Sequence, residues 1–180
     1  MNSKPDRCDL LIRNGRVIDG TGAISRTADV AISGDRIDAV GDLKYIRAEQ
    51  VVDATGYIVS PGFIDVHTHD DHLLMVNPEV TPKLSQGVTT VVIGNCGISL
   101  SPWLADRSPP PPMNLIGTQE SYHFPTFATF CSELERKPAA INSVPLIGHS
   151  TLRCAAMEDL DRPAREREIQ IMKTQLRACL

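Results

Sequence analysis

The stretch that decides the fold is residues 58–69, which read IVSPGFIDVHTH. Its apolar part predicts a buried β-strand that opens into a polar loop at its C-terminal end. Because side chains alternate between the two faces of a strand, we expect Asp65, His67 and His69 to point to the same side. Two imidazoles on one face can hold a divalent metal, although two histidines satisfied in a surface loop would give the same pattern. The place of the pair, at the end of an apolar strand, favours the metal, since α/β barrels keep their chemistry there.

Two further strands are predicted after this one. Residues 88–93, VTTVVI, form a β-branched run without alternation, which is typical of a strand covered on both faces. Residues 141–147 predict the third strand of the same kind. The three strands, near 58–66, 88–93 and 141–147, alternate with helical patterns and so predict strand-helix units with a parallel sheet.

The helices between these strands have recognisable ends. Asn77 is expected to cap a short helix that has Pro78 in its first turn and ends at Gly87. Thr126 is expected to cap the next helix, and a last helix is expected from Asp161 onwards. Residues 99–122, with prolines at 109–112, predict a solvated loop insertion.

The N-terminal part of the chain has another character. Residues 8–56 contain short strands with turn signals, among them Asn14-Gly15 and Ser33-Gly34-Asp35, each of which predicts a β-hairpin. We therefore expect a small β-sandwich segment over residues 1–56, followed by a barrel segment over residues 57–180.

The number of strand-helix units bounds the fold. Three units are found, no strand follows the last helix, and a closed (β/α)₈ barrel takes about 250 residues. The expected fold class is therefore α/β, an incomplete (β/α)₈ TIM-type barrel of the first three or so units preceded by the small β-sandwich segment. The sequence is expected to be the front part of such an enzyme, truncated inside a helix.

Cys96 follows the second strand as the two histidines follow the first. Neighbouring parallel strands lie about 4.7–4.9 Å apart, so their C-terminal ends should bring His67, His69 and Cys96 into one pocket. A thiolate is a good zinc ligand, whereas a lone cysteine is more often a small buried apolar residue. His149 follows the third strand and could contact a substrate or only end the strand. Asp65 could assist the metal or hydrogen-bond the strand end.

The composition excludes several classes of protein. The 180 residues carry a formal net charge of -4, so no basic surface for nucleic acid or an anionic membrane is indicated. No apolar run is long enough to span a membrane. The five cysteines are odd in number and widely scattered, which favours reduced thiols and a cytoplasmic location.

The motifs together resemble a known family. The stretch SPGFIDVHTH at 60–69, TPKLSQGVTT at 81–90, GNCGIS at 94–99 and GHSTLR at 148–153 are similar to the D-aminoacylase (N-acyl-D-amino-acid deacylase) branch of the amidohydrolase superfamily. The resemblance runs over residues 9–180.

The resemblance implies a β-sandwich beside a zinc-containing barrel, with His67, His69 and Cys96 as metal ligands. It implies hydrolysis of the amide of a small-molecule N-acyl-D-amino acid, with release of a carboxylate and a D-amino acid. The remaining ligands and the general base are expected beyond Leu180, so no catalytic residue is assigned here and residues 1–180 alone are expected to be inactive.

Two alternatives stay open. One is another metal-dependent amidohydrolase of the cyclic amidase type, against which the setting of Cys96 argues. The other is a non-catalytic amidohydrolase-like scaffold, which would have no need of three intact ligands.

Overall fold

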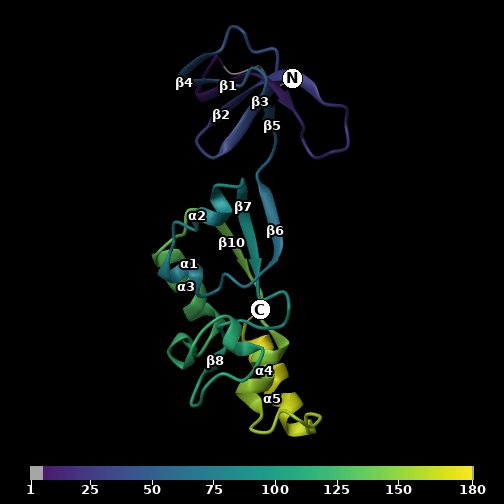
Figure 1. Ribbon diagram of the computed structural model, residues 1–180, viewed down its shortest axis with the longest axis vertical. Coiled ribbons are helices and arrows are strands. Elements are labelled where there is room, and N and C mark those ends of the chain that lie inside the picture. The colour runs from purple at the N-terminus through teal and green to yellow at the C-terminus, as the bar shows by residue number, and fades with distance from the viewer. Residues whose placement is uncertain (1–5, 180) are drawn as a thin grey trace. The chain divides into compact units, whose positions relative to one another are not determined.

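The computed structural model describes residues 6–179 (Figure 1). The chain divides into two compact units, Met1–Pro61 and Gly62–Leu180. The division falls later than the boundary expected after residue 56, because β5 (Ile58–Val59) pairs in parallel with β1 (Arg7–Val17) of the first unit. The predicted strand at 58–66 is therefore two strands, one in each unit.

The first unit is one five-stranded sheet. Its strand order is β3-β2-β1-β4, with β5 beside β1. β1 is antiparallel to β2 and parallel to β4 and β5, and small groups of buried apolar side chains such as Leu11 and Val30 stabilise it. The other strands are β2 (Arg26–Ser33), β3 (Arg36–Gly41) and β4 (Arg47–Asp53).

One of the two predicted hairpins is confirmed and the other is wrong. β2 and β3 pair as a hairpin, and Gly34 at the turn has φ +57°. At Asn14-Gly15, in contrast, β1 continues, and its register with β2 shifts between Ile12 and Gly15. Asn14 has φ 61° and its backbone N–H donates to Asp29 Oδ1 at 2.9 Å. The left-handed tolerance of Asn serves a β-bulge here and not a chain reversal.

The second unit contains a parallel sheet of three strands in the order β10-β7-β6. Its members are β6 (Phe63–Thr68), β7 (Val88–Ile93) and β10 (Asn142–Pro145). Figure 1 shows α1 (Leu73–Val76), α2 (Thr81–Leu84) and α3 (Phe127–Arg136) to one side of it. This is a mixed α/β arrangement that corresponds to part of a barrel.

The apolar core lies between this sheet and its helices. Val91 and Ile93 of β7 are fully buried, together with Leu74 of α1 and Phe130 of α3. The opposite face is open, since Ile64, Val66 and Val144 expose 61%, 60% and 46% of their surface.

The helices differ from the predicted ones at two places. Asn77 does not begin a helix but follows α1 as its C-cap, and the chain turns at Val80, which has φ 41°, before α2. Gly87 has the expected left-handed conformation, with φ +80°. Thr126 caps α3 as predicted, its side chain accepting from Thr129 N at 3.2 Å. The last helix, α5 (Glu166–Arg177), begins after Pro163, later than predicted.

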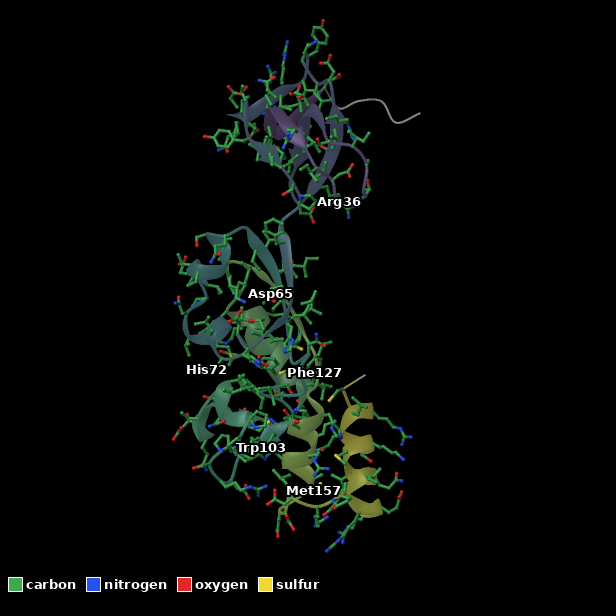
Figure 2. All side chains as sticks on the ribbon, turned by 45° about the vertical axis from the view of Figure 1, so that its right-hand side comes forward. Arg36, Asp65, His72, Trp103, Phe127 and Met157 are labelled. Carbon is green, nitrogen blue, oxygen red and sulfur yellow. The ribbon has the colours of Figure 1, made fainter. Side chains whose placement is uncertain are left out.

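The segment 99–122 is not the solvated insertion that its prolines suggested. It contains β8 (Trp103–Leu104), which pairs with β9 (His123–Phe124), and two short 3₁₀ turns at Met113–Leu115 and Gln119–Ser121. Trp103 (Figure 2) is buried in the main apolar core with Met113 and Tyr122. The large apolar residues of this segment are far apart in sequence, but their burial in the core determines its structure more than the prolines and polar residues between them do.

The described cysteines are all free thiols, as expected. Among residues 6–179, no helix combines the length and the apolar character that crossing a bilayer requires.

Candidate metal centre

The structure brings the three predicted ligands together. One ligand atom from each of His67, His69 and Cys96 lies within 4.8 Å of the others, and all three residues are exposed. Cys96 Sγ is 3.6 Å from His69 Nδ1, and the two imidazole rings are 5.7 Å apart at an angle of 65°. These are the residues of the group; no carboxylate among residues 6–179 belongs to it.

The donor set fits a divalent metal. Zinc binds histidine nitrogen at about 2.0–2.1 Å and thiolate at about 2.3 Å, which places sulfur and nitrogen ligands about 3.6 Å apart in a tetrahedral site. The distance between Cys96 and His69 has this value without any rearrangement. Imidazole and thiolate ligands together favour zinc over magnesium or calcium.

Cys96 is held in place by a tight turn after β7. Gly97 N donates to Gly94 O at 3.0 Å, which closes the turn around Asn95 and Cys96. Gly94 has φ +83°, and a Cβ atom there would lie 2.2 Å from Leu146 O. The position therefore requires glycine both for its conformation and for its space. Asn95 Nδ2 donates to Val66 O at 2.7 Å and so ties the turn to β6, the strand that carries the histidines.

A β-bulge in β6 re-aims the side chains around the histidines. Asp65 pairs with Val91 and Thr68 pairs with Ile93, so β6 uses three steps where β7 uses two. Val91 and Ile93 are buried beneath the helices, and paired residues of parallel strands face the same side. Asp65 and Thr68 therefore face the helices. The prediction that Asp65 shares a face with His67 and His69 is wrong, because the extra residue breaks the alternation.

Asp65 is held by a lysine from α2. Lys83 Nζ lies 2.5 Å from Asp65 Oδ2, 2.9 Å from Thr68 Oγ1 and 3.2 Å from Asp70 Oδ2. The hydrogen bond from Lys83 holds the pKa of Asp65 below its usual value. Burial opposes the charge of Lys83, yet its hydrogen bonds to Asp65 and Asp70 together raise its pKa. Both carboxylates are thus engaged as structural acceptors and not as ligands.

Asp71 lies next to this group and is fully buried. Neither of its carboxylate oxygens accepts a hydrogen bond of acceptable geometry from a described residue. Burial raises the pKa of Asp71 to about 7, and the backbone of Asp71 itself and of Leu100 offsets this only in part. The complete burial of Asp71 could not be read from the sequence.

The other histidines are not part of the three-residue group. His149 is exposed and begins α4 (His149–Ala156), a helix that was not predicted. It lies between Gly148, whose N–H donates to Ser99 Oγ, and Ser150, whose N–H donates to Gly97 O at 2.8 Å. His72 precedes α1 as its N-cap residue. His123 is exposed, and its Nδ1 lies 2.8 Å from Glu120 O.

Two contributing residues were missed in the sequence. Lys83 looks like one surface charge between Pro82 and Leu84, and its partner Asp65 is 18 positions away. Asn95 could have been suspected from the sequence, since it lies in a short Gly-rich turn beside the predicted cysteine ligand. Its hydrogen bond to Val66, however, depends on strand pairing that the motif does not reveal.

Comparison with known proteins shows to which family the chain is related. A model of the amidohydrolase family matches residues 50–178. The chain is 51% identical over 165 residues to a D-aminoacylase of Alcaligenes xylosoxydans xylosoxydans, covering 92% of this chain and 34% of the relative. It is 46% identical to an N-acyl-D-aspartate deacylase of the same organism, covering 98% of this chain and 35% of the relative.

Solved structures give the same result. The crystal structure of a D-aminoacylase superposes with a TM-score of 0.91 at 49% identity, covering 95% of this chain and 36% of that chain. An N-acyl-D-glutamate deacylase from Bordetella bronchiseptica, solved with zinc and a phosphonate inhibitor, gives a TM-score of 0.90 at 40% identity over 97% of this chain and 36% of that chain. The chain therefore spans about a third of the length of these relatives.

Proposed function

Because this chain belongs to the amidohydrolase family, we propose that it contributes three ligands to a zinc centre. The enzyme containing this centre would hydrolyse the amide bond of N-acyl-D-amino acids. The observation that carries the proposal is the convergence of His67, His69 and Cys96 from two neighbouring strands. The similarity to deacylases of D-amino acids over 92–98% of the chain supports the reaction class.

The chain's own residues hold and orient the centre. His67 and His69 would supply nitrogen and Cys96 would supply sulfur, with the Asn95 bond to Val66 fixing the distance between their two strand ends. Zinc held by these residues would supply Lewis acidity for the amide carbonyl and would lower the pKa of water to near neutral pH. His149, at the start of α4, is proposed to contact the substrate.

Residues 6–179 offer no free carboxylate beside the ligands to serve as general base. Asp65 and Asp70 are bonded to Lys83, and Asp71 is buried away from solvent. Proton transfer to the leaving amine needs such a group, so we expect no appreciable turnover from residues 1–180 alone. The free cysteines are consistent with the cytoplasmic location proposed for the protein.

The first prediction tests the metal site itself. Cys96→Ala removes the sulfur ligand of the proposed set, so we expect zinc affinity at least about tenfold below that of the unchanged chain. Zinc content after dialysis and competition with a chromophoric chelator measure this. Cys131→Ala, at a half-buried cysteine of α3, is the matched control and should leave zinc affinity unchanged. Equal zinc affinity in the Cys96→Ala chain would remove Cys96 from the ligand set.

The reaction class needs a separate assay. The complete protein that contains this chain should release D-amino acids from their N-acetyl derivatives and leave the L-enantiomers intact. Hydrolysis of a cyclic amide, with no action on the linear substrates, would favour the cyclic amidase alternative. Zinc binding without hydrolysis of either substrate type would favour the scaffold.

A further inference from the structure

The bulge in β6 leaves the backbone around His67 without regular strand pairing. Between Asp65 and Thr68, β6 carries one residue more than β7, and His67 lies inside this interval. A bulged residue has lost part of its ladder of hydrogen bonds, so other contacts must fix its orientation. One such contact is the bond from His67 N to Asp65 Oδ1, at 3.2 Å.

The side chains on both sides of the bulge meet at Lys83. Its ammonium group contacts Asp65 before the bulge and Thr68 and Asp70 after it, at 2.5, 2.9 and 3.2 Å. Thr68 Oγ1 in turn donates to Asp70 Oδ2 at 2.7 Å. The side chains of Lys83, Asp65 and Asp70 expose only 25%, 30% and 14% of their surface, so water screens these contacts less than it screens a surface ion pair.

Lys83 is the shared partner of both carboxylates. Two carboxylates lie close to a single ammonium group, and no other lysine or arginine among residues 6–179 forms an ion pair with either of them. A half-buried ion pair contributes little net stability, and one role of such a pair in proteins is to select the conformation of the segments that it joins. Here the selected conformation is that of the segment carrying His67 and His69.

We propose that Lys83 is a positioning residue for the metal centre, clamping Asp65 and Asp70 so that the bulge presents His67 and His69 toward Cys96. This inference rests on the proposed metal site and assigns a role within it to a residue that does not touch the metal. Lys83 acts through Asp65, whose carboxylate holds the backbone N–H of His67.

The experiment compares metal binding in variants of the 180-residue chain at low protein concentration. Lys83→Met keeps the length of the side chain and removes its charge. We expect a 10–100-fold loss of zinc affinity, measured by chelator competition, and a changed visible absorption spectrum of the cobalt-substituted chain. Lys83→Arg, which keeps the charge, should recover part of the affinity.

Lys173→Met on α5 is the matched control, because it removes an exposed lysine of the same unit. Unfolding of this unit is followed in every variant through the fluorescence of Trp103, the single tryptophan. A merely structural lysine would change the unfolding midpoint and leave the zinc affinity and cobalt spectrum of the folded chain as in the control. That result would overturn the proposal.

The remaining outcomes also decide the question. If Lys83→Met does not fold, Asp65→Asn is assayed in the same way, and zinc affinity equal to that of the control overturns the inference. If the unchanged chain binds no zinc, both the proposed centre and the role of Lys83 fail. If the unchanged chain binds zinc, Cys96→Ala does not, and Lys83→Met binds as tightly as the control, only the role of Lys83 fails.

Discussion

At the scale of single residues, Asp71 is a carboxyl group placed where charge is costly. It lies two positions after His69, is fully buried, and has no side-chain hydrogen-bond partner among the described residues, while the backbone of Asp71 and Leu100 offsets the burial only in part. An unpaired buried polar group costs about 1–3 kcal/mol, and a charged one costs more. Asp71 is therefore a local source of instability next to the candidate metal centre.

Asp71→Asn keeps the shape of the side chain and removes its charge. The folded-state pKa is raised from 3.8 to about 7, so the folded state holds the proton more tightly than the unfolded state does. Stability should therefore fall as pH rises from about 4 to about 7. We expect the variant to lose this slope and to gain about 1–2 kcal/mol in free energy of unfolding at pH 8.

Urea unfolding at a series of pH values, followed through Trp103 fluorescence, measures both effects. Asp161→Asn removes an exposed carboxylate of the same unit and should keep the slope of the unchanged chain. A slope that survives in the Asp71→Asn chain would show that another group is responsible.

At the scale of elements, α5 begins with a pair of charges in a fixed geometry. Arg162 donates to both carboxylate oxygens of Glu168, at 2.6 and 2.8 Å, and Arg165 N donates to Glu168 Oε2 at 2.7 Å. The hydrogen bond from Arg162 is the main reason that the pKa of Glu168 is lowered from 4.5 to about 2. This carboxylate therefore stabilises the start of the helix.

Acid should weaken the start of α5 over a defined range. Because the pKa of Glu168 is depressed in the folded chain, its stabilisation is present above pH 4.5 and is lost as pH falls toward about 2. We expect Glu168→Gln to lower amide protection in the first turns of α5 already at pH 6. Hydrogen exchange, corrected for intrinsic rates, measures this. Glu166→Gln, in the same turn but bonded to Gln170, should keep the protection, and equal losses in both variants would contradict the role of Glu168.

The strands of the second unit were predictable from the sequence, because continuous runs of apolar and β-branched residues mark them clearly. The β-branched run at 88–93 favours a strand and forms β7, although only the face with Val91 and Ile93 is covered by the helices. The proximity of the three candidate ligands was predictable too: His67 and His69 lie at the C-terminal end of β6, Cys96 follows β7, and adjacent parallel strands bring these ends together.

What failed was decided by contacts that a local pattern does not contain. Asn14 takes the left-handed conformation that its motif suggested, but β1 continues past it with a bulge against β2, and its other edge pairs with β4 up to Arg13. Asn77 could cap a helix, yet the chain first turns at Val80, which has φ 41° and is fully buried in the core, before α2 begins. The extra residue in β6 likewise could not be predicted, because the alternation of side chains along residues 63–69 fits a regular strand.

At the scale of the whole molecule, the three-stranded sheet of the second unit is covered on one face only. Val92 of β7 pairs with Val144 of β10 on the face opposite to the buried Val91 and Ile93, and Val144 is 46% exposed. β6 and β10 each pair with β7 alone among the described strands. Exposed apolar faces and unpaired strand edges promote association between chains.

We expect residues 1–180 in isolation to associate as their concentration rises. Light scattering coupled to size exclusion, over a range of loading concentrations, measures the apparent mass. Val144→Lys places a charge on the open sheet face and should raise the concentration at which association begins by several-fold. Leu115→Lys adds the same charge at a 65% exposed site away from the sheet and should have little effect. A constant monomer mass for the unchanged chain would contradict the expectation.

The closeness of the ligands along the chain has a consequence for synthesis. The two histidines lie at the end of β6, and Cys96 lies in the turn after β7. All three residues therefore leave the ribosome before β10 is made. The loop that joins the histidines to Cys96 is short, and because the entropy cost of closing a loop increases with its length, the cost of bringing these residues together is small. A metal ion captured by the nascent chain would cross-link the first two strands and hold them in register while the third emerges. A metal centre at these residues would thus act as a template for folding before any substrate is encountered.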